Sequence, residues 1–356
     1  MAQIDQRPNY CDFMTEIRYA KCGNKFLLQI EELIDWRPIN AYLNRKYTKT
    51  QNAVGPPAYP APLMFKILLL GIWYGLNDEA LEERINDAIS FSRFLGISMD
   101  KKAPDHSTIS RFRSTLVKLE IMEKLLDPFN KQLKKKHLLT VKGVIVDASI
   151  VESPNTPSII PDYEVADDRS DDCSSEEKEK EEKAHQKYKL DNDGDSEARW
   201  VKKKDEYYYG YKKHVATDLN GLVISIHTTP ANVSDITEFK PLMEKTEVPR
   251  QVKVYADKGY PSAANRAVLK EKKLKDGIMR KKPKGSPISE IERLRNKLIS
   301  KSRWVIERTF GSIQKWFGGG RCRYLGLAKT HFQNVFESLA YNFYRVPGLV
   351  IAQRAK

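Results

Sequence analysis

The feature that most limits the fold of this chain is an aspartate inside an apolar run. Residues 143–149 read Gly-Val-Ile-Val-Asp-Ala-Ser, a nearly continuous apolar stretch of the kind that forms a buried strand. Burying a carboxylate costs free energy unless a counter-charge or a metal ion compensates it. We therefore expect Asp147 to have a functional partner, and the alternative is an ordinary hydrogen-bonded strand residue.

The residues after this strand predict a mixed β-sheet. A hairpin is indicated by the Asn-Gly pair at 220–221, which joins two β-type runs. Further strands then alternate with helices, so the order is β, β, β, α, β, α, β, α. The predicted strands are 143–150, 207–217, 223–229, 251–256 and 277–280, and the predicted helices are about 234–244, 263–273 and 289–316. This order favours an α/β fold with helices on both faces of a mixed sheet.

The N-terminal part of the chain has a helical pattern. We divide it into an N-terminal segment with a proline-rich connector, residues 1–60, and a helical region, residues 61–140. One helix is expected to start at a cap formed by Asp105 or Ser107. Its polar face carries Thr108, Ser110, Arg111 and Arg113. Such a face is typical of a helix-turn-helix-like DNA reader, but equally of an ordinary solvated helix.

Charge is distributed unevenly along the chain. Residues 161–200 carry 15 acidic side chains against 7 basic ones, whereas the whole chain has a net charge of +14. The remainder is therefore strongly basic, which favours a polyanionic partner such as nucleic acid. We interpret residues 162–206 as an acidic insertion, disordered or partly helical, because they contain too few apolar residues to form a core. This insertion is expected to be dispensable for the activity of the protein.

Several classes of protein are disfavoured. The four cysteines and six histidines lack zinc-site spacing, and no Gly-Lys dipeptide supports a nucleotide-binding phosphate loop. We therefore expect no nucleotide cofactor. The longest apolar run, 67–76, is half of what a membrane span needs, and no signal segment is evident. We expect a cytoplasmic, nucleoid-associated protein without a membrane partner.

The C-terminal residues, 318–356, begin with three glycines. Gly318 to Gly320 are expected to stop the preceding helix and to form a mobile joint, because glycine tolerates positive φ. The apolar helix that follows, at about 328–344, is predicted to dock on the core.

Two further carboxylates have positions that suit chemistry. Asp257 follows the predicted strand 251–256, and Glu307 lies among basic residues on the last long helix of the sheet region. Three clustered carboxylates repel one another, and divalent cations that prefer oxygen ligands remove this repulsion. We therefore expect Asp147, Asp257 and Glu307 to bind Mg²⁺ or Mn²⁺ and to support phosphodiester chemistry. The alternatives are a turn or cap role for Asp257 and an arginine pair for Glu307.

At these residues the chain resembles the DDE transposases of bacterial insertion sequences, in the group called IS-five, which have a ribonuclease-H-like catalytic core. Five ordered blocks carry the resemblance: 146–151, 210–218, 229–235, 256–260 and 303–310. The resemblance implies a catalytic and metal-binding triad of Asp147, Asp257 and Glu307 in a catalytic domain at 141–317. It also implies double-stranded DNA as partner, both transposon terminal inverted repeats and target DNA, and a homodimer or larger synaptic assembly.

Related transposases carry a signature of Tyr, Arg, Glu and Lys on the last helix of the catalytic domain, and this chain matches it in part. Arg303 and Glu307 match, whereas Ser300 stands at the expected tyrosine and Gln314 at the expected lysine, with Lys315 one residue later. Basic and aromatic residues near the site are candidates for DNA contact. They are Lys212, Lys213, His214, Lys258, Arg280, Lys281, Lys282, Arg303, Trp304, Arg308 and Lys315.

The resulting interpretation is a transposase that binds insertion-sequence ends and catalyses metal-dependent strand cleavage and strand transfer. A nuclease of the same fold that only hydrolyses DNA is the first alternative. A catalytically silent DNA-binding regulator derived from a transposase is the second, although a binder has no need for three clustered carboxylates.

Overall fold

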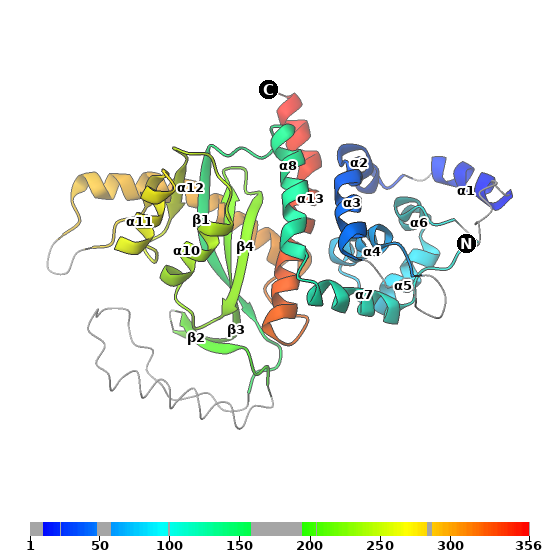
Figure 1. Ribbon diagram of the computed structural model, residues 1–356, viewed down its shortest axis with the longest axis horizontal. Helices are drawn as coiled ribbons and strands as arrows, with labels where there is room; N and C mark the ends of the chain where they lie inside the picture. The colour runs from blue at the N-terminus through cyan, green and yellow to red at the C-terminus, as the bar shows by residue number, and fades with distance from the viewer. Residues whose placement is uncertain are drawn as a thin grey trace. The chain divides into compact units, whose positions relative to one another are not determined.

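The computed structural model of the chain describes residues 10–21, 23–47, 58–98, 100–157, 194–203, 205–282 and 287–355 (Figure 1). The chain divides into two units. The first comprises Met1–Thr140, Lys315–Phe317 and Phe336–Lys356, and the second comprises Val141–Gln314 and Gly318–Val335. In the part that the structure describes, no helix is both long and apolar enough to cross a membrane.

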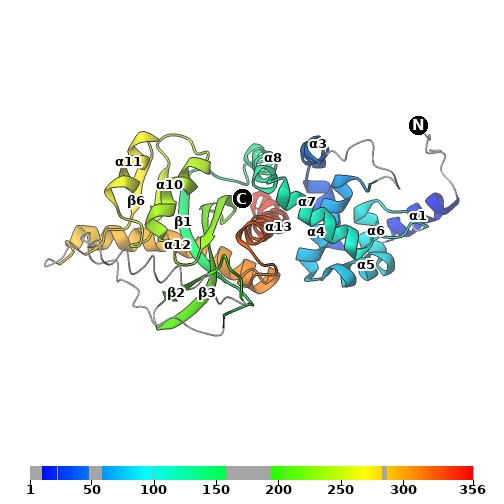
Figure 2. The ribbon, with the colours of Figure 1, turned by 60° about the horizontal axis from the view of Figure 1, so that its bottom comes forward.

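The first unit is helical. Its main helices are α1 (Tyr10–Ala20), α2 (Lys25–Leu33), α3 (Trp36–Lys46), α4 (Ala61–Tyr74), α5 (Asp78–Asp87), α6 (Ile89–Leu95), α7 (His106–Lys118) and α8 (Met122–Lys135). Helix α4 contacts α5, α6 and α7 and forms the centre of the group (Figure 2). It is apolar around its circumference, with nine buried residues, which is the pattern of a helix enclosed by others.

The caps of these helices follow the sequence closely. Gly75, with a φ of 65°, ends α4 in the left-handed region, and Asn77 caps α5 by accepting from the amide of Ala80 at 2.8 Å. Asp105 caps α7 by accepting from the amide of Thr108 at 2.7 Å. Of the two caps expected for this helix, the structure uses the aspartate.

The proline-rich connector does not separate two packing units. Helix α3 precedes it, yet packs against α4 and α8, which follow it. The amide of Asp35 donates to Oε1 of Gln132 at 3.0 Å, and Nε2 of Gln132 donates back to the carbonyl of Asp35 at 2.7 Å. The division at residue 60 is therefore wrong for the packing, because α2 and α3 join the same helical unit. Connector residues 55–57 lie outside the described residues.

The second unit contains a six-stranded mixed sheet. Its strands are β1 (Gly143–Glu152), β2 (Arg199–Lys203), β3 (Glu206–Asp218), β4 (Val223–Pro230), β5 (Lys253–Ala256) and β6 (Lys275–Ile278). The order is β2-β3-β1-β5-β6, with β4 also paired to β3. Pairs among β1 to β4 are antiparallel, whereas β5 is parallel to both β1 and β6. The mixed sheet predicted from the sequence is thus confirmed.

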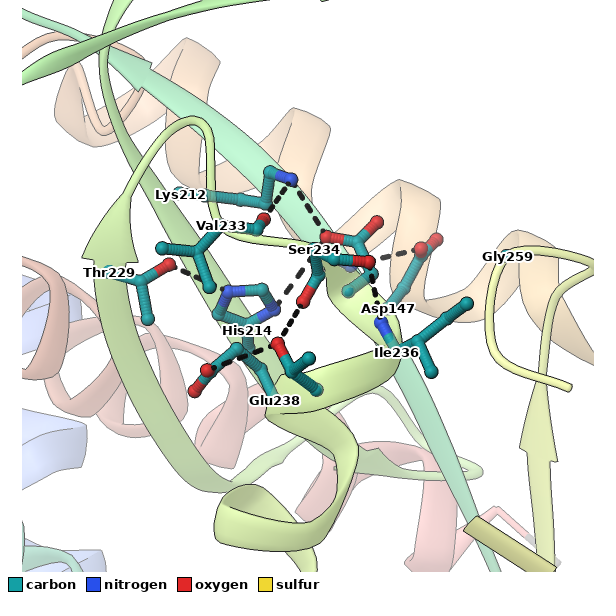
Figure 3. A network of polar contacts seen from close by, with 12 residues as sticks. Asp147, Lys212, His214, Thr229, Val233, Ser234, Ile236, Glu238 and Gly259 are labelled. Atoms are coloured by element: carbon teal, nitrogen blue, oxygen red, sulfur yellow. Dashed lines mark hydrogen bonds and ion pairs between the residues drawn. The ribbon is translucent and has the colours of Figure 1, made fainter. Parts of the chain in front are cut away.

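Helices flank this sheet. They are α10 (Asp235–Lys245), α11 (Ala263–Glu271) and the parts of α12 (Glu290–Phe317) and α13 (Leu327–Arg354) that belong to the second unit, up to Gln314 and Val335 respectively. In Figure 3, α12 passes behind the strands, whereas α10 lies in front of them. The predicted hairpin is also present: β3 and β4 are joined at a turn where Gly221 has a φ of +85°, and Oδ1 of Asp218 accepts from the amides of Asn220 and Leu222 at 2.9 and 2.8 Å.

The acidic insertion ends earlier than predicted. We expected residues 162–206 to remain outside the fold, but 199–203 form strand β2, which pairs with the first half of β3. Trp200 packs on Tyr209 with ring centroids 5.2 Å apart. The predicted boundary is wrong because two apolar residues in a charged stretch suffice when a partner strand covers them. Residues 162–193 and 204 of the insertion lie outside the described residues.

The three glycines after α12 are bonded to the sheet. Gly318 ends α12 with a φ of 69°, as expected for a helix stop. The carbonyl of Gly319 accepts from Nζ of Lys213 at 2.7 Å, and that of Gly320 accepts from the amide of Glu152 at 2.9 Å. The prediction of a mobile joint is therefore wrong. Likewise, 318–356 is not a separate element, because residues up to Val335 belong to the second unit and those from Phe336 to the first.

Candidate active site

Two aspartates lie at the same level of the sheet. Strands β1 and β5 pair in parallel up to two residues before Asp147 and Asp257, so the register brings both carboxylates to one edge. One oxygen of each is held by a backbone amide. Oδ1 of Asp147 accepts from Ala148 N–H at 2.9 Å, and Oδ1 of Asp257 accepts from Gly259 N–H at 2.6 Å. These bonds fix the orientation of both side chains.

The free oxygens face one arginine. Nη2 of Arg303, on α12, lies 2.8 Å from Oδ2 of Asp147 and 4.0 Å from Oδ2 of Asp257. The same nitrogen lies 3.6 Å from Oε1 of Glu307, one helical turn later. Three carboxylates from two strands and a helix thus surround a single guanidinium nitrogen. The predicted meeting of Asp147, Asp257 and Glu307 occurs, with a cationic side chain among them.

The three carboxylates differ in exposure. Their side chains are 16% exposed for Asp147, 35% for Asp257 and 61% for Glu307. Burial raises the pKa of Asp147, and the charge and hydrogen bond of Arg303 oppose this shift. Burial also disfavours the charged form of Arg303, but its pKa is raised overall because Asp147, Asp257 and Glu307 favour the cation. Each group therefore favours the charged form of the other, although burial still leaves the pKa of Asp147 raised.

The donor set suits a hard divalent cation. Carboxylate oxygens are the ligands that Mg²⁺ and Mn²⁺ prefer, and the three that face Arg303 already converge on one position. Among the described residues, no group of three His, Cys, Asp or Glu side chains is close enough to form a metal site as it stands. The chemistry of the oxygens fits an ion, and the position on which they converge is held by Nη2 of Arg303.

Comparison with known proteins assigns this unit. Residues 141–343 match the family described as transposase DDE domain, which covers more than half of the chain. The chain belongs to the DDE transposase family. Residues 16–115 also match a second family, described as transposase domain (DUF772).

A curated relative supports the same assignment. The transposase for insertion sequence element IS1106 of Neisseria meningitidis serogroup B is 34% identical over 244 residues, which cover 65% of this chain and 75% of the relative. The crystal structure of a pre-cleavage Mos1 transpososome aligns over 96% of this chain and 98% of its own, with 10% identity and a TM-score of 0.18. That superposition is too poor to inform the fold. The predicted resemblance to the DDE transposases of bacterial insertion sequences is confirmed, and so is the prediction that the protein is an enzyme of this class.

A polar network lies beside the aspartates of this transposase. Figure 3 shows it between β3, β4 and the start of α10, with Asp147 next to it. Nε2 of His214 is 3.0 Å from Oγ1 of Thr229, and its Nδ1 is 3.9 Å from Oδ1 of Asp235. Nζ of Lys212 pairs with the same Asp235 oxygen at 2.9 Å and donates to the carbonyl of Val233 at 2.8 Å. The network ties the loop before α10 to the sheet.

This network corrects part of the predicted DNA surface. Lys213 and His214 are each 1% exposed, and the side chain of Lys212 is 13% exposed. Burial, followed by the charge of Lys212, lowers the pKa of His214 to about 3, so its imidazole is neutral. The prediction that these three residues contact DNA is wrong for the structure as it stands, because their polar atoms hold strands, loops and a glycine carbonyl together.

The remaining basic candidates of the second unit differ in their surroundings. Lys258, Lys281 and Lys282 are exposed, and Trp304 is 53% exposed. The guanidinium of Arg308 lies 4.7 Å from the centre of the Trp304 ring and donates to the carbonyl of Asn220 at 3.1 Å. Arg280 lies 3.8 Å from a carboxylate oxygen of Asp276. The lysines and Trp304 are thus available to a ligand, whereas the arginines already have partners.

The four predicted DNA-contact residues of helix α7, in the first unit, also differ in their surroundings. Ser110 and Arg111 are exposed, and Nη2 of Arg111 donates to the hydroxyl of Ser107 on its own helix. Arg113 is instead bonded to Asp78 on α5, with Nη1 2.9 Å from Oδ2, and its side chain is 14% exposed. The hydroxyl of Thr108 donates to the capping Asp105 at 2.9 Å. Thr108 thus serves the cap of α7 and Arg113 joins α7 to α5, whereas Ser110 and Arg111 are the exposed members of the predicted set.

At the end of α12, Gln314 and Lys315 have different surroundings. Nε2 of Gln314 donates to the hydroxyl of Ser149 on β1 at 3.3 Å. Lys315 is exposed and falls in the first unit. The residue at the expected lysine position thus contacts the strand that carries Asp147.

Sequence reasoning missed the central position of Arg303, which we expected to contact DNA. Its spacing of four residues from Glu307 on a helix indicates a neighbouring side chain, but nothing local shows that both aspartates lie on the same side. The ion pair between Asp235 and Lys212 was also not predicted from the sequence.

Proposed function

We propose that Asp147, Asp257 and Glu307 are the catalytic triad with which this transposase cuts DNA at the ends of its element and joins the freed 3′ hydroxyl to target DNA. The observation that carries the proposal is the convergence of three carboxylates from β1, β5 and α12 on one point. Isolated surface carboxylates have no reason to share a single cationic partner. DDE transposases generally use divalent metal ions.

We assign the metal, Mg²⁺ or Mn²⁺, to these three residues. When bound, such an ion activates the attacking water or hydroxyl and stabilises the leaving oxygen of the phosphodiester. The protein's own contribution is orientation. The amides of Ala148 and Gly259 fix one oxygen of each aspartate, so the second oxygen of each points into the site. Glu307 has no such backbone anchor and supplies the adjustable ligand.

The sheet supports the finer fold assignment. Three antiparallel strands, β1, β3 and β4, precede parallel β5 and β6, and α12 carries the last acidic residue. This arrangement is what the resemblance to a ribonuclease-H-like core implies, and we propose that core for the second unit. Catalytic residues then sit where strand ends and a helix meet, as in other open α/β sheets.

We propose a DNA surface made of the exposed members of the predicted set. In the second unit these are Lys258, Lys281, Lys282 and Trp304, and in the first unit Ser110, Arg111 and Lys315. Exposed lysines neutralise phosphates without sequence preference, whereas an exposed indole stacks on an unpaired base. Lys258 directly follows Asp257, so it suits the phosphate next to the bond that is cut.

We further propose that the transposase acts as a homodimer or larger assembly on double-stranded DNA. The part of the chain that the structure describes contains one such triad, and an element has two ends that must be cut and joined together. Terminal inverted repeats present the same sequence at both ends, which suits two copies related by two-fold symmetry.

The test is metal-dependent cleavage and joining of a labelled duplex that carries the element's own end. We expect Asp147→Asn and Glu307→Gln to lose both cleaved and joined products while still binding the duplex. The matched control is Glu290→Gln, on the same helix, whose carboxylate is 78% exposed and pairs with Arg293. This control should retain both products.

Other outcomes separate the alternatives. Cleavage without joined products would favour a nuclease. Duplex binding by the wild type with no metal-dependent product would favour a silent regulator, and full activity of Glu307→Gln would refute the assignment of this triad.

A further inference from the structure

The guanidinium of Arg303 occupies the point on which the free carboxylate oxygens converge. A single nitrogen, Nη2, is 2.8, 4.0 and 3.6 Å from oxygens of Asp147, Asp257 and Glu307. The other oxygen of each aspartate is turned away and bonded to backbone. The position and charge of Nη2 are therefore those of a cation held by all three groups.

The remainder of the guanidinium is poorly accommodated. Nε of Arg303 is buried and has no hydrogen-bond partner among the residues that the structure describes, although a buried donor without a partner costs free energy. The side chain as a whole is 16% exposed. An arginine whose place was shaped for it would have its rigid fork of donors satisfied. The attraction of the three carboxylates, rather than a fitted pocket, accounts for this conformation.

We propose that Arg303 is a positioning residue that holds the three carboxylates together before the divalent ion binds, and that it competes with the ion for them. The proposal rests on the metal site proposed above. Without any cation, three carboxylates at this distance repel one another and separate. Arg303 prevents this, but the ion must displace its terminal nitrogen to gain the same oxygens.

Competition of this kind has a defined signature. Removing the guanidinium leaves the carboxylate oxygens to the ion alone, so metal affinity rises. Coupling between two interacting binding events in a protein typically changes affinity by about 5-fold to 150-fold, and we take the lower end, about fivefold, as the expected increase. A residue that only supported the fold, or only contacted DNA, would lower metal affinity or leave it unchanged when replaced.

The experiment measures Mn²⁺ binding to the full chain without DNA, from the electron paramagnetic resonance signal of free Mn²⁺. We compare the wild type with Arg303→Gln and with Arg295→Gln as the matched control. Arg295 lies two turns earlier on α12, is 26% exposed and pairs with Asp276, so its loss breaks an ion pair away from the site. We expect tighter binding in Arg303→Gln alone and a larger rise in melting temperature on adding Mn²⁺.

Arg303→Lys covers the case in which the glutamine variant does not fold. Lysine keeps one charge but lacks the planar fork, so Mn²⁺ affinity should lie between those of the wild type and the glutamine variant. Affinity equal to or weaker than that of the wild type, in whichever of these two variants folds, overturns the proposal. If Asp147→Asn with Asp257→Asn does not weaken Mn²⁺ binding in any background, the metal site itself is refuted instead.

Discussion

Asp195 offers the sharpest test of how the end of the acidic segment folds. It is 2% exposed, and its Oδ1 accepts from the hydroxyl of Tyr211 at 2.8 Å. Both of its carboxylate oxygens lie 3.2 Å from the amide of Gly326. One side chain thus joins the residues before β2 to strand β3 and to the segment before α13. We predict that Asp195→Ala destabilises the second unit strongly.

The magnitude follows from the partners left behind. Alanine removes the acceptor for the Tyr211 hydroxyl, which is on a fully buried residue, and for the half-buried Gly326 amide. Leaving a buried donor unpaired costs about 1–3 kcal/mol, so the loss for both is about 2–4 kcal/mol. For a unit of this size that corresponds to a fall in melting temperature of about 5–10 °C. Asp195→Asn keeps one acceptor oxygen and should lose about 1 kcal/mol.

The assay is urea unfolding followed by circular dichroism, with Asp205→Ala as control. Asp205 is an exposed acid in the same region of the chain, so its replacement should change the free energy of unfolding by less than about 0.5 kcal/mol. If Asp195→Ala unfolds at the same urea concentration as this control, the argument that Asp195 organises the segment is refuted.

Three further outcomes are expected. The pKa of His214 is about 3 in the folded state and 6.5 in the unfolded state. The free energy of unfolding should therefore be highest above pH 6.5 and fall as the pH drops towards 3, by up to about 1.4 kcal/mol per pH unit. In urea unfolding at a series of pH values, His214→Gln should lose less stability over this range. Gly221→Ala should cost about 1–3 kcal/mol in thermal melts, since φ is +85° and a Cβ would lie 2.7 Å from Oγ1 of Thr309. Arg111→Ala should reduce the slope of log affinity for DNA against log salt by about 0.9 if it contacts one phosphate, and an unchanged slope counts against that contact.

The meeting of Asp147 and Asp257 at one edge of the sheet could be predicted because its signal is local. Asp147 interrupts an apolar strand, and Asp257 follows another, so strand register alone brings them together once the two strands pair. The Asn-Gly turn was equally readable, since Gly221 adopts the positive φ that the pair favours. In each case a few adjacent residues carry the physical reason.

Strand β2 and Asp195 could not be found in this way. Trp200 and Val201 are surrounded by charged residues, so the average composition of this stretch is that of a disordered segment. What orders them is contact with Tyr209 and Tyr211 on β3. The burial of Lys213 has the same cause, because the Gly319 carbonyl that accepts its hydrogen bond is 106 residues away. Such long-range partners leave no pattern in the local sequence.

The site combines two carboxylates that backbone amides hold, those of Asp147 and Asp257, with two side chains of α12, Glu307 and Arg303, that lack such a bond. Backbone amides anchor Asp147 and Asp257, and the network of Lys212 and Asp235 holds the neighbouring loop to the sheet. Glu307 is 61% exposed, and Nε of Arg303 has no hydrogen-bond partner among the described residues, so both side chains are less constrained than the two aspartates. In the proposed metal site, these two side chains of α12 therefore adjust around the cation, while backbone amides keep Asp147 and Asp257 in place.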